Sequence, residues 1–183
     1  MQNTPQYSTT RRAALACALA TSLMPCAHAI AGVTKFPELK LKLYNLHTTE
    51  SIDAVFWANG QYNIDALADL NRLLRDHRTN EIKPIDPRLF SLLYLLNKKI
   101  SNHRAVSVIS GYRSPATNQM LAERNAGVAT NSYHVKGRAI DIRIPGKDTK
   151  KLRDIGIKLG VGGVGYYERS NFAHFDTGPR RSW

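Results

Sequence analysis

Two segments in the second half of the chain alternate apolar and polar residues, which is the pattern of a strand with one buried face. In residues 138–144 the three isoleucines share one face, and Asp141 falls on the other. In residues 172–176 the same alternation places His174 and Asp176 on the face opposite the apolar residues. The pattern therefore predicts two strands whose polar faces carry carboxylate and imidazole side chains.

The remaining periodicity predicts a hairpin, two short strands and four helices. Alternation on both sides of a polar turn predicts the hairpin, and two helices have an N-cap residue followed by proline as a start signal. The hairpin covers residues 39–57, the helices cover 62–76, 86 onward, 114–126 and 147–159, and the short strands cover 105–110 and 164–167. We expect a single α+β domain, with an antiparallel sheet flanked by helices.

The first 29 residues differ from the rest of the chain. Arg11 and Arg12 precede a run of small and apolar residues that ends in the small-x-small pattern Ala27-His28-Ala29. The run is too short to span a membrane as a helix. We expect residues 1–29 to be an export signal, by the twin-arginine or the ordinary secretory route, and residues 30–183 to form a periplasmic or otherwise exported domain.

Removal of this segment would leave a basic chain without cysteine. Cys17 and Cys26 both lie in it, so stability must come from burial and not from disulfides. Two of the 26 basic residues and none of the 14 acidic ones lie there, so the rest carries a net charge of +10. A basic excess suits a solvated surface or an anionic partner. The anionic partner could be nucleic acid, a membrane surface or the cell-wall polymer, and of the three export most strongly disfavours nucleic acid. We expect a monomer without a membrane span.

Three residues have the chemistry of a metal site. His134 lies seven residues before Asp141, and His174 lies on the second of the two predicted strands. Two histidines and a carboxylate are a common ligand set for zinc, with a fourth position open for water. Two neighbouring strands and the loop before one of them would bring the three side chains together. From spacing alone, structural histidines that only form hydrogen bonds remain the alternative.

The surrounding sequence resembles a known group of enzymes. The segment SYHVKGRAID, residues 132–141, matches every fixed position of the S-x-H-x-x-G-x-A-x-D signature of the LAS metallopeptidases, which include D-Ala-D-Ala peptidases and the hedgehog domain. The earlier SGYRS and the closing HFDTGPRRSW are more similar to the MepK (YcbK) family of murein endopeptidases, over residues 39–183. The resemblance implies a hedgehog-like fold, a zinc ion bound by His134, Asp141 and His174, and hydrolysis of amide bonds in peptidoglycan cross-links.

Arg113 follows a predicted strand and precedes a helix, a place where functional side chains are often displayed. A capping or ion-pairing arginine is the alternative. The resemblance to D-Ala-D-Ala peptidases implies a catalytic role for Arg113 in binding the substrate or its oxyanion, and a guanidinium can grip a carboxylate with two parallel hydrogen bonds. Ser132, Tyr133 and Tyr166 are candidates to line the cleft.

The proton-transfer group departs from the pattern of the relatives. Many of them have His two residues before the last ligand, or Glu three residues before it, where this chain has Phe172 and Asn171. Asp176 is the candidate replacement because it shares a strand face with His174, and Glu168 is a weaker one. The alternative for Asp176 is a carboxylate that orients a ligand histidine.

Two classes of function follow. The complete ligand set favours an endopeptidase or a D,D-carboxypeptidase, and the unfilled base position favours a catalytically silent module that binds zinc or murein. The sequence does not say whether a bond from D-alanine to diaminopimelate or one between two diaminopimelates would be cut.

Overall fold

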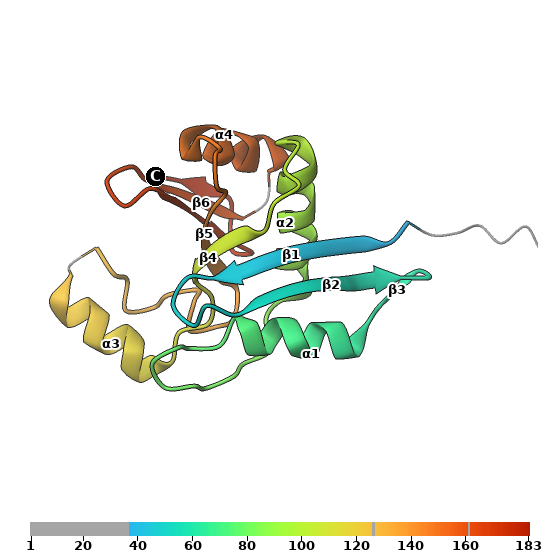
Figure 1. Ribbon diagram of the computed structural model, residues 1–183. Coiled ribbons are helices and arrows are strands. Elements are labelled where there is room, and N and C mark those ends of the chain that lie inside the picture. Colours follow the sequence, from blue (N-terminus) through green and yellow to red (C-terminus); the bar gives the residue numbers. More distant parts are fainter. Residues whose placement is uncertain (1–36, 126, 161) are drawn as a thin grey trace, which may run out of the picture. The chain divides into compact units, whose positions relative to one another are not determined.

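The computed structural model describes residues 37–125, 127–160 and 162–183. The export signal predicted for residues 1–29 lies outside the described residues. Those that are described belong to one compact unit, in which an eight-stranded sheet is combined with four helices (Figure 1). The predicted α+β class is confirmed.

The sheet is mixed. Its strands lie in the order β3-β2-β1-β4-β5-β7-β6-β8, and β1–β4 and β6–β8 are parallel pairs while the other pairs are antiparallel. The expected sheet was antiparallel throughout. Parallel neighbours need a long connection, and β1 is joined to β4 through the rest of the hairpin and two helices. The strands are β1 (Leu39–Asn45), β2 (Ser51–Ala58), β3 (Gln61–Tyr62), β4 (Val106–Ser110), β5 (Ala139–Arg143), β6 (Gly163–Tyr167), β7 (Phe172–Asp176) and β8 (Arg181–Ser182).

Each helix begins at a residue whose side chain accepts a hydrogen bond from a backbone N–H of the first turn, which satisfies a group that has no partner inside the helix. These N-cap residues are Asn63, Asp86, Ser114 and Asp148. The helices are α1 (Ile64–Leu73), α2 (Pro87–Lys99), α3 (Pro115–Arg124) and α4 (Thr149–Leu159). No helix in the described part of the chain is long and apolar enough to cross a membrane.

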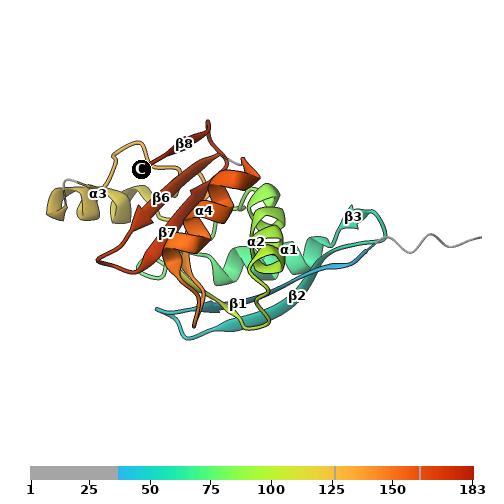
Figure 2. The ribbon, with the colours of Figure 1, turned by 90° about the horizontal axis from the view of Figure 1, so that it is seen from above.

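One face of the sheet carries the hydrophobic core. Helix α1 packs on β2, α2 packs on β1, and α4 packs on β6 and β7 and touches α2 (Figure 2). The apolar side chains of these helices join those of the strands in one buried cluster. Leu43, Phe56, Leu93, Ile140 and Phe175 are fully buried in it. The other face of β5, β7 and β6 is thereby left for polar side chains.

Candidate metal centre and active-site cleft

Strands β5 and β7 place two of the three candidate ligands side by side. The strands are antiparallel neighbours, and their register pairs Asp141 with His174. Ile140 and Ile142 point into the core and have no exposed surface, so the alternation turns Asp141 to the opposite face. Because directly opposite residues share a face, His174 emerges beside it.

The third candidate, His134, comes from the loop before β5. The loop turns at Gly137, where φ is +65° and where a Cβ atom would lie 2.4 Å from the carbonyl oxygen of Pro84. Only glycine fits both conditions without strain. The ring Nδ1 of His134 lies 2.7 Å from the carbonyl oxygen of Gly111. A carbonyl only accepts, so Nδ1 donates, and the other ring nitrogen, Nε2, faces the two strands.

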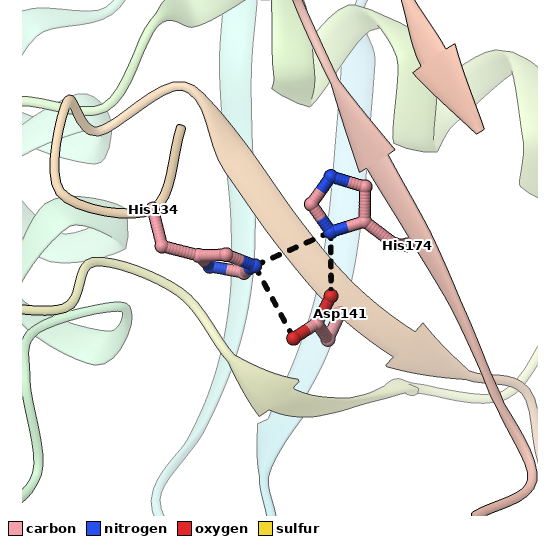
Figure 3. A group of neighbouring side chains, drawn as sticks. All are labelled: His134, Asp141 and His174. Atoms are coloured by element: carbon pink, nitrogen blue, oxygen red, sulfur yellow. Dashed lines mark hydrogen bonds and ion pairs between the residues drawn. The ribbon is translucent and has the colours of Figure 1, made fainter. Parts of the chain in front are cut away.

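The three side chains converge on one point (Figure 3). His134 Nε2 lies 3.3 Å from His174 Nδ1 and 3.2 Å from an Asp141 carboxylate oxygen, and His174 Nδ1 lies 2.8 Å from the other oxygen. All three side chains are buried. Bonds of about 2.0–2.1 Å to a tetrahedral zinc ion separate neighbouring ligand atoms by about 3.3 Å. The spacing and the donor set therefore fit a metal ion of this kind.

The charges of the site favour a cation. Burial raises the pKa of Asp141, but the charges and hydrogen bonds of His134 and His174 outweigh it and hold that pKa well below its usual range. Burial lowers the pKa of His174, yet hydrogen bonds to Asp141 and Asp176 raise it to about 9. Two ionised carboxylates thus flank one imidazole and supply the negative charge that a bound cation would balance.

Asp176 lies behind His174. Its side chain has no exposed surface, and one oxygen lies 3.1 Å from His174 Nε2. The other oxygen accepts from the backbone N–H groups of Gly163 and Gly178, at 3.0 and 2.8 Å, and Arg181 donates to both oxygens. Burial raises the pKa of Asp176, but these hydrogen bonds hold it well below its usual range. An ionised Asp176 accepts from Nε2–H, which leaves the Nδ1 lone pair for a metal.

A cleft of about 870 Å³ opens over the three candidate ligands. Ser132 and Tyr133 line it, as expected, but Tyr166 does not, and that expectation was wrong. Tyr166 pairs with Ala173 on the core face of the sheet, and the next residue, Tyr167, faces the cleft. The full lining is Arg113, Asn125, Gly127, Val128, Ala129, Asn131, Ser132, Tyr133, His134, Asp141, Tyr167, Ser170, Phe172, His174, Pro179, Arg181 and Trp183.

Two glycines of β6 make room beside the site. A Cβ atom at Gly163 would lie 2.4 Å from an oxygen of Asp176, and one at Gly165 would lie 2.7 Å from Cε2 of Trp183. Both glycines fall on the face of His174, with which Gly165 pairs directly. The absent side chains therefore let Asp176 and Trp183 pack over the strand.

Arg113 reaches the cleft from the loop between β4 and α3. One guanidinium nitrogen lies 3.8 Å from an Asp141 oxygen and donates to Ser110 at 3.4 Å, and another donates to Asn118 at 3.2 Å. Burial lowers the pKa of Arg113 below its ordinary value, although Asp141 opposes the shift. The guanidinium is thus fixed at the edge of the ligand group, with its charge directed into the cleft.

The two positions where many relatives carry a base hold no ionisable side chain. Asn171 lies in the β6–β7 turn at φ +50° and accepts a hydrogen bond from Thr149, and the ring of Phe172 stacks on Tyr167 with centroids 4.4 Å apart. Glu168 is exposed and is not part of the cleft lining. Among the described residues that line the cleft, Asp141 is the one carboxylate.

This arrangement defines a class of protein: α+β peptidases in which a His–Asp–His group at the floor of a cleft holds the metal. A family model described as peptidoglycan L,D-endopeptidase MepK matches residues 35–183. The chain is 46% identical over 166 residues to peptidoglycan L,D-endopeptidase MepK of Escherichia coli K12, with 91% of each chain covered. It is 39% identical over 168 residues to the probable MepK of Haemophilus influenzae, with 91% of this chain and 89% of the relative covered. The chain belongs to the MepK family.

Proposed function

We propose that this chain is a metal-dependent peptidoglycan endopeptidase that hydrolyses L,D-amide bonds between murein peptides. The observation that carries the proposal is the convergence of His134, Asp141 and His174 under an open cleft. Membership of the MepK family supplies the substrate class, since peptidoglycan is what the names of the relatives specify.

Zinc is the metal that we propose for the site. Two imidazole nitrogens and a carboxylate oxygen suit zinc better than magnesium or calcium, which prefer six or more oxygen ligands. When bound, zinc lowers the pKa of a coordinated water to about 7 and polarises a carbonyl group, so that an amide can be attacked at neutral pH.

The chain's own groups would prepare the site for that chemistry. Gly111 fixes the tautomer of His134, and Asp176 fixes that of His174, so each ring directs a lone pair at the same point. Arg113 would bind a carboxylate of the murein peptide or the oxyanion that forms during attack, because it projects into the cleft beside Asp141.

Asp176 is proposed as an orienting residue. Of the two roles that the sequence leaves open, proton transfer requires reach to the substrate. The complete burial of Asp176, its place behind His174 and its four hydrogen-bond partners support the orienting role. Proton transfer by Asp176 stays a prediction, and the zinc affinity and turnover of Asp176→Asn distinguish it from the orienting role.

The bond between two diaminopimelates is the cross-link that we propose as substrate. A bond from D-alanine to diaminopimelate uses the carbonyl group of a D-centre and is therefore a D,D bond. A bond between two diaminopimelates joins the carbonyl group of an L-centre to the amine of a D-centre. The relatives are named L,D-endopeptidases, which matches the second bond.

Residues 1–29 are proposed as the export signal of this enzyme, and residues 30–183 as the exported domain. The support is the paired Arg11 and Arg12, the apolar run and the small-x-small end at Ala29. A peptidoglycan substrate lies outside the cytoplasm, so a protein that acts on it must be exported.

Metal analysis and digestion of purified sacculi test the proposal together. The mature protein should contain about one zinc per chain, and His134→Ala, Asp141→Ala and His174→Ala should each lose it. The parent should release muropeptides from sacculi, and the three variants should not. Full metal retention in all three variants would contradict the proposed metal site.

A catalytically silent module is the second candidate. It is favoured by the cleft lining, in which the described residues offer no carboxylate apart from Asp141. Such a module would bind zinc and sediment with sacculi but would release no muropeptide, so the same digestion separates the two candidates.

A further inference from the structure

Arg181 holds the carboxylate that orients His174. One guanidinium nitrogen lies 2.6 Å from one oxygen of Asp176, and another lies 3.2 Å from the second oxygen. This two-pronged contact fixes the plane of the carboxylate as well as its position. The oxygen at 2.6 Å is the one that contacts His174 Nε2, and Arg181 is its second partner.

The same guanidinium lies between two aromatic rings of the cleft wall. Its central carbon is 5.1 Å from the ring centroid of Tyr133 and 5.0 Å from that of Trp183. Cation–π contacts of this length are attractive, and arginine also stacks on ring faces. Both rings and Arg181 line the cleft, so the guanidinium fills the space between two segments that are distant in sequence.

Each of these rings lies next to one of the candidate ligand histidines, either in the chain or in space. Tyr133 immediately precedes His134, and its ring packs so closely on Gly178 that a Cβ atom there would lie 2.5 Å from it. Trp183 packs on His174, with ring centroids 5.3 Å apart. Arg181 therefore contacts Tyr133, which precedes His134 in the chain. It also contacts Asp176 and Trp183, and both of these side chains contact His174.

We propose that Arg181 is a positioning residue that sets the geometry of both ligand histidines at once. The proposal rests on the proposed metal site. Arg181 would act on that site through Asp176, Tyr133 and Trp183, and this role requires no contact with the substrate. Its charge also pairs with the fully buried Asp176 carboxylate.

Removal of the guanidinium should loosen the metal site more than the fold. Asp176 would keep its two backbone donors on one oxygen, but the oxygen facing His174 would lose its second partner. Tyr133 and Trp183 would lose the group packed between them. Groups that orient a ligand histidine typically contribute 10–100-fold to metal affinity, and we expect Arg181→Ala to weaken zinc binding about 10-fold or more.

Arg180→Ala is the matched control. The neighbouring arginine is exposed, as Arg181 is, but its guanidinium lies against Gly160, so its removal changes the net charge equally and leaves the Asp176 contact in place. Zinc affinity is measured for the full mature proteins by competition with a chromogenic chelator. Thermal unfolding of the metal-free proteins reports the fold separately.

The expected result is a loss of zinc affinity in Arg181→Ala that is absent from Arg180→Ala, with a metal-free unfolding transition that stays cooperative in both. Equal zinc affinity in Arg181→Ala and the parent would overturn the proposal. If Arg181→Ala does not fold, Arg181→Lys decides: lysine keeps the charge but cannot grip two oxygens at once, so its affinity should fall severalfold, and parental affinity would overturn the proposal. A parent that binds no zinc would instead refute the metal site itself.

Discussion

At each candidate ligand histidine, a hydrogen bond to one ring nitrogen decides which nitrogen can reach a metal. His134 donates from Nδ1 to a backbone carbonyl, and His174 contacts a buried carboxylate through Nε2. The two rings thus direct opposite nitrogens, Nε2 of His134 and Nδ1 of His174, toward Asp141. Partners of this kind fix the ring orientation before the metal arrives, which lowers the cost of ordering the site on binding.

Asp176→Asn separates the two roles of that carboxylate. An amide of the same shape retains the packing but removes the charge, so the orienting role predicts a 10–100-fold loss of zinc affinity. Activity should fall in parallel and recover when zinc is added in excess. Asp154→Asn is a matched control, because this half-exposed carboxylate pairs with Arg153 on α4. Full zinc occupancy with turnover reduced about 10²–10⁴-fold would identify a proton-transfer residue instead.

The protonation state of His174 gives a second test at the residue scale. Its folded-state pKa of about 9 lies above the ordinary 6.5, so the protonated ring contributes stability below pH 6.5 that is lost as the pH rises toward 9. In metal-free protein at pH 7.5, nitrogen-15 NMR should therefore show protons on both ring nitrogens. Addition of zinc should remove the Nδ1 proton and leave the proton directed at Asp176. A neutral His174 in the metal-free protein would contradict this assignment.

At the element scale, Gly156 lets α4 pack closely on β7. A Cβ atom there would lie 2.3 Å from a ring carbon of Phe175, which is fully buried and adjacent to His174. Gly156→Ala should destabilise the protein by about 1–3 kcal/mol through overpacking, although alanine is the better helix former by about 1 kcal/mol. Denaturation in urea measures the change.

Lys158→Ala, at an exposed position of the same helix, is the control and should change the free energy of unfolding by less than about 0.5 kcal/mol. If Gly156→Ala proves as stable as the parent or more so, the contact between α4 and β7 is looser than described, and helix propensity decides the outcome.

The elements that the sequence predicts well are those with a strong local signal. The strand at Asp141 has a continuous alternation, and α2 begins where Asp86-Pro87 indicates. Strands β3 and β8 have two residues each, too few for any period, and the parallel pairs depend on partners distant in the chain.

Sequence patterns also fail to predict some single positions of the cleft lining. On β6 the residues facing the site before Tyr167 are glycines, so the alternation carries no side-chain signal. The pattern therefore does not show that Tyr167, and not Tyr166, faces the cleft. The convergence of the three candidate ligands was foreseen because the motif and the two strand patterns agree on it. The contact of Arg181 with Asp176 could not be foreseen, since it depends on how the segment after β7 returns along β6.

At the scale of the whole molecule, the proposed export signal can be tested apart from the enzyme. N-terminal sequencing of the exported protein should begin at Ile30, after the small-x-small end at Ala29. If the twin-arginine route is used, replacing Arg11 and Arg12 by lysine should hold the precursor in the cytoplasm. Normal export of that variant would refute the route and leave the cleavage site standing, and an exported chain that retains residues 1–29 would refute the cleavage.

The basic balance of the exported chain, +10 by formal charge, is consistent with a polymer that carries free carboxylates. Much of that charge lies outside the cleft, whose lining holds two arginines in its described part. Selection among cross-links should therefore depend on the cleft, and overall charge should affect mainly the rate at which the enzyme meets its substrate.

Cleavage of purified dimeric muropeptides is the most direct test of the account. One dimer carries a bond between two diaminopimelates and the other a bond from D-alanine to diaminopimelate, and mass spectrometry identifies the products. The zinc-loaded parent should cleave the first dimer, chelation should abolish cleavage, and restored zinc should recover it, whereas His174→Ala should be inactive throughout. Cleavage that persists after complete removal of metal, or that is confined to the D-alanine bond, would contradict the account.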